Sequence, residues 1–113
     1  MLTWNTLTHV DELEIIKEKS FKKPQVLFKH STRCLTSSLV KKRLERSSEV
    51  PDADFYYLNL IRYRDVSNKI SDIFNIYHES PQVLLIKDGK CFYNESHFGI
   101  DMHELSDKIA ALN

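Results

Sequence analysis

One segment of the chain decides its fold, residues 24–37, which read PQVLFKHSTRCLTS. The run Val26–Phe28 is apolar without alternation, as expected for a strand covered on both faces, and predicts a central strand over residues 24–29. Ser31 and Thr32 are good helix-capping residues. They precede an apolar stripe at helical spacing, which consists of Leu35, Leu39, Val40 and Leu44. Cys34 therefore falls in the first turn of the predicted helix.

On both sides of this segment, strands alternate with helices. Residues 2–7 are a weak strand candidate, and a helix is predicted from about residue 9 to residue 20, with Thr8 and Asp11 in capping-box spacing. Residues 55–61 are rich in aromatic and aliphatic side chains and indicate another strand. A third helix is predicted from about Asp65.

The C-terminal part predicts a hairpin and a last helix. Residues 82–87 and 91–94 are apolar runs around Asp88-Gly89, a dipeptide that favours a tight turn between antiparallel strands. Asp101 and Glu104 predict the start of a helix whose apolar face consists of Met102, Leu105, Ile109 and Leu112. The order β-α-β-α-β-α-β-β-α predicts an α/β fold, with a mixed central sheet and helices on both faces. Ligands approach such sheets at the carboxyl ends of the strands, where Cys34 is expected.

The composition favours a small soluble domain. A chain of 113 residues with 42% hydrophobic residues can form one core, and we expect a single domain over residues 1–113. The 16 basic residues are balanced by 16 acidic residues, so the net charge gives no general attraction to nucleic acid or to an anionic membrane. No apolar run approaches the roughly 20 residues that a bilayer requires, and no signal segment is recognisable. We expect a cytoplasmic protein without a structural disulfide.

Cys34 is the candidate catalytic residue. The partial positive charge and free amides of a helix N-terminus stabilise a thiolate, which is the reactive form of cysteine. Arg33, one residue earlier, adds a second favourable charge. The alternative is that Cys34 is a small buried residue that begins an amphipathic helix.

Two further features accompany this cysteine. Ser37 lies three residues after Cys34 on the same helical face, where its hydroxyl can donate a hydrogen bond to the thiolate. It takes the place of the second cysteine of a Cys-x-x-Cys motif, so another molecule must supply the thiol that resolves a mixed disulfide on Cys34. Ser80 and Pro81 directly precede the strand over residues 82–87, and proline is tolerated at such a strand start.

The remaining candidates favour structural roles. The five histidines show none of the spacings of zinc sites, and no metal is expected. His30 and His78 should approach the Cys34 end of the sheet, either to tune the thiolate or as surface and capping residues. Cys91 is interpreted as a packed, inert thiol on an edge strand, with a resolving role as the alternative.

A basic run follows Cys34 along its helix and consists of Lys41, Lys42, Arg43 and Arg46. The simplest interpretation is a solvated polar face. The alternative is a docking surface for acidic partners.

Four segments together resemble the monothiol bacilliredoxins: FKHSTRC at residues 28–34, YLNLIRYRDVSN at residues 57–68, HESPQ at residues 78–82, and Ser96-His97. They span nearly the whole chain in the same order. The resemblance implies a thioredoxin fold with a cis bond between Ser80 and Pro81. It also implies Cys34 as the nucleophile, with Thr32, Ser80 and Pro81 facing the substrate.

The implied activity is the removal of bacillithiol, a low-molecular-weight thiol, from mixed disulfides on cytosolic proteins. No bound cofactor is expected, and bacillithiol would be the co-substrate. The chain has Cys34-Leu35-Thr36-Ser37 where the family commonly has Cys-Pro-Ile-Ser. The missing proline frees φ and restores an amide donor in the first helical turn, so reactivity and substrate preference should differ from those of relatives. Two alternatives remain open: a redox-silent binding module that holds a peptide by strand-like pairing, and a reductase that uses glutathione, coenzyme A or cysteine.

Overall fold

Five strands form one mixed sheet in the order β1-β3-β2-β4-β5. The computed structural model describes residues 2–112. The central strand β2 (Gln25–His30) is parallel to β3 (Asp54–Asn59) and antiparallel to β4 (Gln82–Lys87). The edges are β1 (Trp4–Thr6), parallel to β3, and β5 (Lys90–Ser96), antiparallel to β4. The predicted mixed sheet is confirmed.

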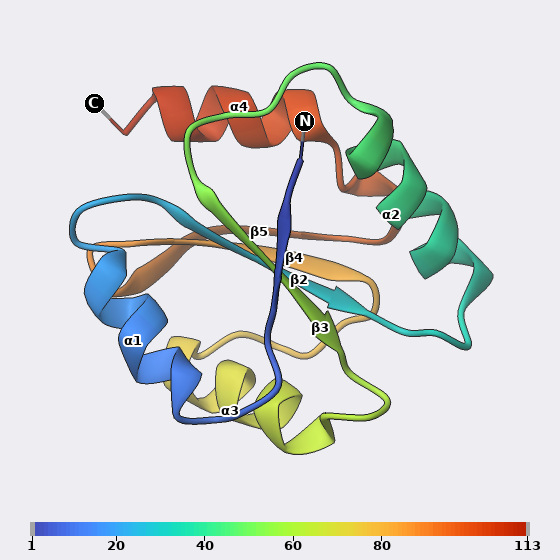
Figure 1. The fold of residues 1–113 in the computed structure, drawn as a ribbon, viewed down its shortest axis with the longest axis horizontal. Coiled ribbons are helices and arrows are strands. Elements are labelled where there is room, and N and C mark those ends of the chain that lie inside the picture. The colour runs from blue at the N-terminus through green and yellow to red at the C-terminus, as the bar shows by residue number, and fades with distance from the viewer. Residues whose placement is uncertain (1, 113) are drawn as a thin grey trace.

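Two helices cover each face of this sheet (Figure 1). The helices α1 (Glu12–Lys19) and α3 (Arg64–Phe74) pack on one face, and α2 (Leu35–Arg46) and α4 (Met102–Ala110) pack on the other. A short 3-10 helix, η1 (His97–Gly99), joins β5 to α4. The predicted order of strands and helices is therefore confirmed, and none of the helices within residues 2–112 has the length and apolarity to cross a bilayer.

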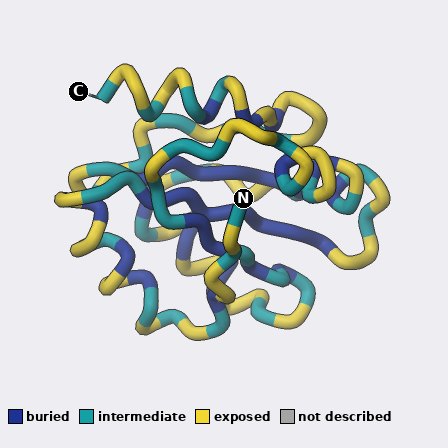
Figure 2. The backbone as a smooth tube through the Cα atoms, turned by 45° about the horizontal axis from the view of Figure 1, so that its top comes forward, coloured by how far each residue is buried: buried dark blue, intermediate teal, exposed yellow. Residues whose placement is uncertain are grey.

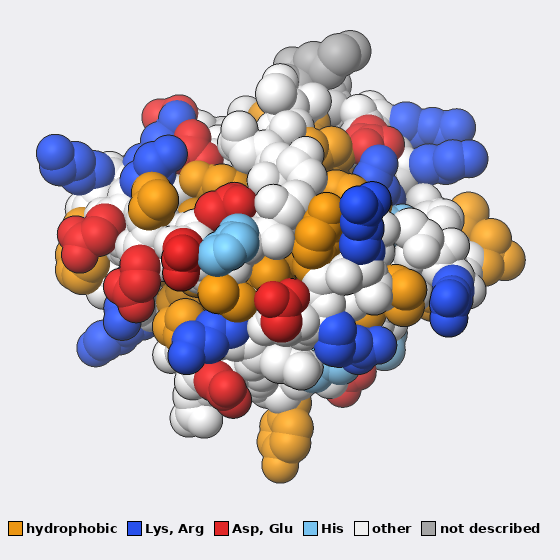
Figure 3. Space-filling view, turned by 60° about the horizontal axis from the view of Figure 1, so that its bottom comes forward, with side chains coloured by type: hydrophobic (Ala, Val, Ile, Leu, Met, Phe, Trp, Pro, Cys, Tyr) orange, Lys and Arg blue, Asp and Glu red, His pale blue; other side chains and the backbone are white. Residues whose placement is uncertain are grey.

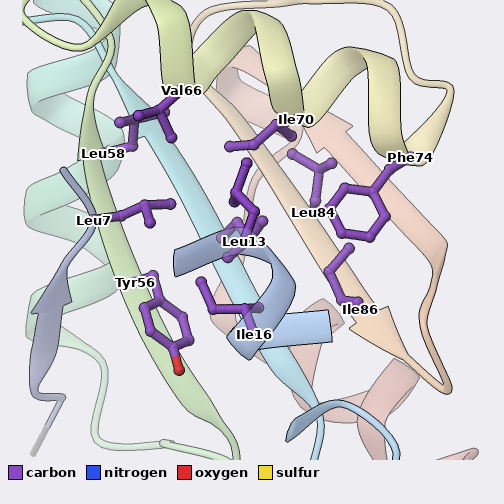
Figure 4. Close-up of a cluster of buried hydrophobic side chains, with 11 residues drawn as sticks. Leu7, Leu13, Ile16, Tyr56, Leu58, Val66, Ile70, Phe74, Leu84 and Ile86 are labelled. Carbon is purple, nitrogen blue, oxygen red and sulfur yellow. The ribbon is translucent and has the colours of Figure 1, made fainter. Parts of the chain in front are cut away.

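The sheet separates two apolar clusters, because successive side chains of a strand point to opposite faces. Leu27 of β2 joins the cluster beneath α1 and α3, which Figure 4 shows from the side of these helices. Val26 and Phe28 join the cluster beneath α2 and α4. All six residues of β2 are buried, and the centre of the molecule is accordingly dark in Figure 2. The prediction of a strand covered on both faces is confirmed.

The first helix begins later than predicted. Before α1, the chain makes two tight turns, in which Glu12 donates to the carbonyl of His9 and Leu13 to that of Val10. The Thr8 hydroxyl lies 3.3 Å from the Glu12 carboxylate, and the capping position Asp11 makes no side-chain cap. The predicted capping box is therefore wrong, because the chain turns twice before the helical hydrogen-bond ladder starts.

Other boundaries shift for local reasons. Strand β3 ends at Asn59, since the Asn59 side-chain oxygen accepts from the amides of Ile61 and Arg62 and turns the chain. Helix α4 is capped by Asp101 as predicted, but it ends at Ala110, so Leu112 lies outside its apolar face. Strand β1 is shorter than predicted and β5 is longer.

The predicted Asp88-Gly89 turn is confirmed, and it is tied to the end of α1. Both residues have positive φ, 53° and 76°, as the tight turn requires. Ser20 accepts the Asp88 amide at its carbonyl and the Gly89 amide at its hydroxyl, at 3.0 and 2.8 Å. The hairpin and α1 are thereby joined at the end of the sheet where β2 begins, away from the carboxyl end of β2.

The apolar stripe predicted for α2 is only partly correct. The sheet-facing residues are Ser37, Val40 and Leu44, whereas Leu35 and Leu39 are 75% and 48% exposed. At 100° per residue, positions 35 and 39 lie on the side of the helix opposite positions 37 and 44. Ser37, which the predicted stripe did not include, is buried, whereas Leu35 and Leu39 are not.

Candidate active site

The connection from β2 to α2 places Cys34 at the start of a helix. After β2 ends at His30, a turn follows in which the Cys34 amide donates to the Ser31 carbonyl at 3.2 Å. Cys34 is the N-cap of α2: its backbone is extended, and its carbonyl accepts from the Ser38 amide at 3.1 Å. Its side chain is partly exposed. The thiol thus lies beside the free amides and the positive end of the dipole of a helix.

Ser37 does not form the hydrogen bond to this thiol that the sequence predicted. Its buried hydroxyl accepts from the Ser31 amide at 3.0 Å and lies 2.7 Å from Nδ1 of His30. Within residues 2–112, none of the hydrogen bonds of Ser37 reaches Cys34. Through these two hydrogen bonds, the hydroxyl instead joins the first turn of α2 to the last residue of β2 and to the turn that follows it.

His30 is the buried partner in this cluster. Its ring packs between Phe28 and Tyr57, with centroids 6.0 and 5.5 Å away. Burial holds the pKa of His30 below its ordinary value, and the charge of Lys41 lowers the pKa further. Neutral His30 can accept a hydrogen bond from the Ser37 hydroxyl, whose oxygen in turn accepts from the Ser31 amide. The sequence placed His30 at this end of the sheet but did not show its partner.

A second segment reaches the same end of the sheet. In the antiparallel register, Gln82 is opposite Lys29, so Pro81 precedes β4 at the end where β2 leads to Cys34. The bond between Ser80 and Pro81 is cis, as predicted, and the Pro81 carbonyl accepts from the His97 amide at 3.0 Å. The Ser80 hydroxyl is buried and has no hydrogen-bond partner in the described chain.

The two other predicted site residues are exposed. Arg33 and Thr32 lie on the turn before Cys34, and the Arg33 amide donates to the Ser31 hydroxyl at 3.3 Å. The turn therefore brings four predicted residues, from positions 32, 33, 34 and 37, within one short stretch of backbone. Their roles in tuning the thiolate and in binding substrate remain predictions.

A buried lysine was missed by the sequence analysis. Lys29 is 0% exposed, and its Nζ lies 3.2 Å from Nδ1 of His78 and 3.4 Å from the Ser71 hydroxyl. Burial lowers the pKa of Lys29 to about 8, and nearby Arg64 adds to the shift. The signal was present, because a strand covered on both faces must bury every side chain it carries.

His78 covers this lysine at the surface. It is exposed and also lies 3.3 Å from the Ser67 hydroxyl. Burial lowers the pKa of His78, and the charges of Lys29 and Arg64 add to this effect. The contact joins the penultimate residue of β2 to the segment that leads to Ser80 and Pro81, whereas no hydrogen bond joins His78 to Cys34 in the described residues.

Cys91 lies far from Cys34 along the sheet. Its register partner Ile86 is opposite Gln25, at the start of β2, whereas Cys34 follows the end of that strand. The Cys91 thiol packs against the cluster beneath α1 and α3 and donates to the Tyr93 carbonyl at 3.3 Å. Burial raises the pKa of Cys91, which disfavours its reactive form. These features favour the predicted inert role.

The basic run on α2 divides into two parts. Lys41 forms an ion pair with Glu45 at 2.7 Å and lies over the Tyr57 ring, beside a small pocket that His30 and Ser38 also line. Lys42, Arg43 and Arg46 lie on the outer side of the helix and are exposed. In the part of the chain that the structure describes, there is no group of three or more His, Cys, Asp or Glu residues that could hold a metal ion.

Comparisons with known proteins find a matching family and similar structures. The family model described as "Monothiol bacilliredoxin BrxC" matches residues 5–105. A solved structure described as a candidate oxidoreductase with a thioredoxin fold is 30% identical, with a TM-score of 0.76 over 90% of this chain and 89% of that chain.

More distant structures are also similar. Thioredoxin from Schistosoma mansoni is 18% identical, with a TM-score of 0.75, and 98% of this chain and 96% of that chain are covered. Thioredoxin from Malassezia sympodialis is 14% identical, with a TM-score of 0.74 and coverage of 96% and 90%. At these identities the likeness shows the thioredoxin fold alone.

The site is suited to thiol chemistry, since a partly exposed cysteine lies at the N-terminus of a helix. The second position of a Cys-x-x-Cys motif is filled by a buried serine. The fold and the family match support a thiol oxidoreductase. With a family model that spans residues 5–105, the chain belongs to the monothiol bacilliredoxin family.

Proposed function

We propose that the protein removes bacillithiol from mixed disulfides on cytosolic proteins, with Cys34 as the nucleophile. The Cys34 thiolate attacks the bacillithiol sulfur of the mixed disulfide, and the protein sulfur leaves as a thiolate that takes up a proton. Cys34 is then disulfide-bonded to bacillithiol. A second bacillithiol, as its thiolate, attacks the bacillithiol sulfur of that bond, which frees the Cys34 thiolate and forms bacillithiol disulfide.

The observation that carries this proposal is that Cys34 is followed three residues later by Ser37, and not by a second cysteine, in a chain of this family. Cys34 lies at the N-cap of α2, and the position three residues later carries a hydroxyl that cannot form a disulfide. An external thiol must therefore complete the cycle. The Ser80-Pro81 segment at the same end of the sheet supports a role in holding the substrate chain.

A single-turnover experiment tests the first step. A protein with one cysteine, linked to bacillithiol, is mixed with an excess of the reduced enzyme without free thiol. We expect one equivalent of substrate thiol to be released and bacillithiol to be found on Cys34 by peptide mass spectrometry. Cys34→Ser should release none. If the wild-type chain releases no substrate thiol either, the protein is a redox-silent binding module.

A multiple-turnover experiment identifies the resolving thiol. Bacillithiol, glutathione, coenzyme A and cysteine are supplied separately at equal thiolate concentration, and the release of substrate thiol is followed. We expect turnover to be fastest with bacillithiol. A higher rate with one of the other three thiols would keep the exchange chemistry but replace bacillithiol as the co-substrate.

A further inference from the structure

An apolar and then basic stripe runs along the outer side of α2, starting beside Cys34. Leu35 and Leu39 are its exposed apolar part, and Lys42 and Arg46 follow at helical spacing. These four positions are separated by three or four residues and therefore lie on one side of the helix. The stripe leads away from the thiol, whereas the sheet-facing residues of α2 are buried beneath it.

The basic end of this stripe borders a groove of about 630 Å³ between α2 and the start of α4. Leu39 and Met102 contribute apolar surface to the groove, and Lys42, Arg43 and Arg46 line it with positive charge. Arg43 donates hydrogen bonds to the carbonyls of Phe98, at 2.9 Å, and Ile100, which hold its guanidinium against η1. We call this feature the α2–α4 groove.

The cations of the α2–α4 groove lack acidic partners in residues 2–112, since none of Lys42, Arg43 and Arg46 takes part in an ion pair there. The carbonyl partners of Arg43 leave its charge unneutralised. One carboxylate, Asp101, also lines the groove, and it accepts from the Glu104 amide. Three cations therefore face one carboxylate.

The α4 side of the groove is different. His103, which lines this side, lies between Glu49 and Asp107, at 3.1 and 3.4 Å, so two carboxylates accompany one imidazole there and the positive charge is confined to the α2 side. On the face toward α1 and α3, by contrast, basic and acidic side chains are interspersed (Figure 3). In a chain with no net charge, the α2 side of the α2–α4 groove is a local concentration of positive charge.

The groove lies within reach of a protein segment that is bound at Cys34. Leu39 is five residues along α2 from Cys34 and Arg46 is twelve, which places them about 7 and about 18 Å away along the helix axis. An extended chain covers about 3.3 Å per residue. Side chains roughly three to five residues from a cysteine at Cys34 therefore reach the groove.

From the unpaired cations, the exposed leucines and this spacing, we propose that the α2–α4 groove docks an acidic segment of the substrate protein, with Asp or Glu three to five residues from the modified cysteine. The proposal rests on the proposed exchange at Cys34 and adds a determinant of substrate choice. Lys42 and Arg46 attract the carboxylates, while Leu35 and Leu39 contact the apolar parts of the same segment.

Peptide pairs test the docking proposal. Each peptide has one cysteine linked to bacillithiol and three glutamates placed three to five residues before or after it, and its counterpart has glutamines there. At low ionic strength, we expect the wild-type rate constant for the better glutamate peptide to exceed that for its counterpart about fivefold to tenfold. The preference should disappear at about 0.5 M salt, where charges are screened within a few ångströms.

Matched variants locate the effect. Lys42→Gln/Arg46→Gln should remove the preference by lowering the rate with the glutamate peptide to the rate with its glutamine counterpart, because both side chains are exposed in the groove. Lys22→Gln/Lys90→Gln removes two exposed lysines at the other end of the sheet and should keep the preference. Equal rates for the two wild-type peptides, or equal losses in both double variants, would overturn the proposal.

Binding without chemistry separates the two proposals. Peptides with serine in place of cysteine are titrated into the wild-type protein by fluorescence anisotropy, with a single-stranded oligonucleotide of equal charge as competitor. A preference for glutamate that the oligonucleotide does not abolish supports the acidic-peptide groove even if exchange at Cys34 fails. Exchange without any such preference supports the proposed function alone, and displacement by the oligonucleotide at equal concentration would make the groove a general polyanion site.

Discussion

Ser37 has a structural role that its sequence position did not reveal. Its hydroxyl joins the Ser31 amide to the His30 ring and so holds the turn that carries Cys34. A hydroxyl and a thiol differ little in size, so cysteine at this position should be accommodated beside the same imidazole. The site therefore differs from a dithiol site by one atom type at a buried position.

Replacing this serine by cysteine should restore an internal route of resolution. In Ser37→Cys, the new thiol attacks the Cys34 sulfur of the mixed disulfide, releases bacillithiol and leaves a disulfide between residues 34 and 37. We expect one equivalent of bacillithiol to be released without added thiol, measured by mass spectrometry. Ser37→Ala, which lacks both the hydroxyl and a thiol, is the control and should release none. Release by the alanine variant would point to another resolving group.

Lys29 is the second residue whose environment decides its properties. It is buried without a carboxylate partner in the described chain, and burial lowers its pKa from 10.5 to about 8. Between these two values, the unfolded chain holds the proton that the folded chain has released. Stability due to this residue therefore rises with pH across that interval and is lost as the pH falls through 8.

Comparison with Lys29→Met isolates this effect. The free energy of unfolding of the wild type, relative to that of Lys29→Met, should increase from pH 8 toward pH 10.5, as measured by urea denaturation at a series of pH values. Other titrating groups are common to both proteins and largely cancel. Lys90→Met, which changes an exposed lysine, is the control for the substitution itself. A flat difference for Lys29→Met would mean that Lys29 is solvated.

At the scale of elements, Ser20 links α1 to the β4–β5 hairpin. Its hydroxyl donates to the Lys17 carbonyl and accepts the Gly89 amide, and its own carbonyl accepts the Asp88 amide. One residue at the end of a helix thereby satisfies both amides of the turn. The hairpin is held at a fixed place on the sheet, away from the carboxyl end of β2.

Loss of this hydroxyl should weaken the junction. Ser20→Ala leaves the Gly89 amide without its partner and should lower the free energy of unfolding by about 1 to 3 kcal/mol. Urea denaturation gives the total, and faster hydrogen exchange at the Gly89 amide localises it. Ser106→Ala is the matched control, because the buried Ser106 hydroxyl has no partner in residues 2–112 and its removal should cost little. Equal losses in the two variants would indicate a packing effect unrelated to the hydrogen bond.

At the scale of the whole molecule, the sheet separates the two cysteines. Cys91 is level with the first residue of β2, and Cys34 follows its last, so the strand's five residue steps place about 16 Å between these levels. A disulfide requires Cα atoms within about 7 Å. The fold therefore excludes Cys91 as a resolving thiol unless the sheet opens.

Turnover should accordingly survive the loss of Cys91. We expect Cys91→Ser to release substrate thiol at the wild-type rate and to depend on the concentration of free thiol in the same way. Mass spectrometry of the wild-type protein during turnover should detect no disulfide between Cys34 and Cys91. A Cys91→Ser protein that stalls at the mixed disulfide while free thiol is plentiful would refute the monothiol mechanism.

Much of this molecule follows from local patterns in the sequence. The unbroken apolar run of β2, the Asp88-Gly89 turn and the Asp101 cap each depend on neighbouring residues, and the structure confirms all three. Helices and strands have fixed periods, so alternation of the two along the chain was sufficient to predict a mixed sheet with helices on both faces. The position of Cys34 at a helix start follows from the same local signals.

Contacts between distant segments were decided only by the tertiary structure. Local period indicates which residues share a side of a helix, but a helix can be rotated, and α2 turned Ser37 inward and two leucines outward. The partners of Lys29 come from α3 and the segment after it, and Arg43 is held by carbonyls near α4. Such pairings form when the packed chain brings together groups that are many residues apart, and no short-range pattern encodes them. The sequence by itself therefore determined the fold and the place of the Cys34 sulfur, while the packing of the folded chain decided what surrounds that sulfur.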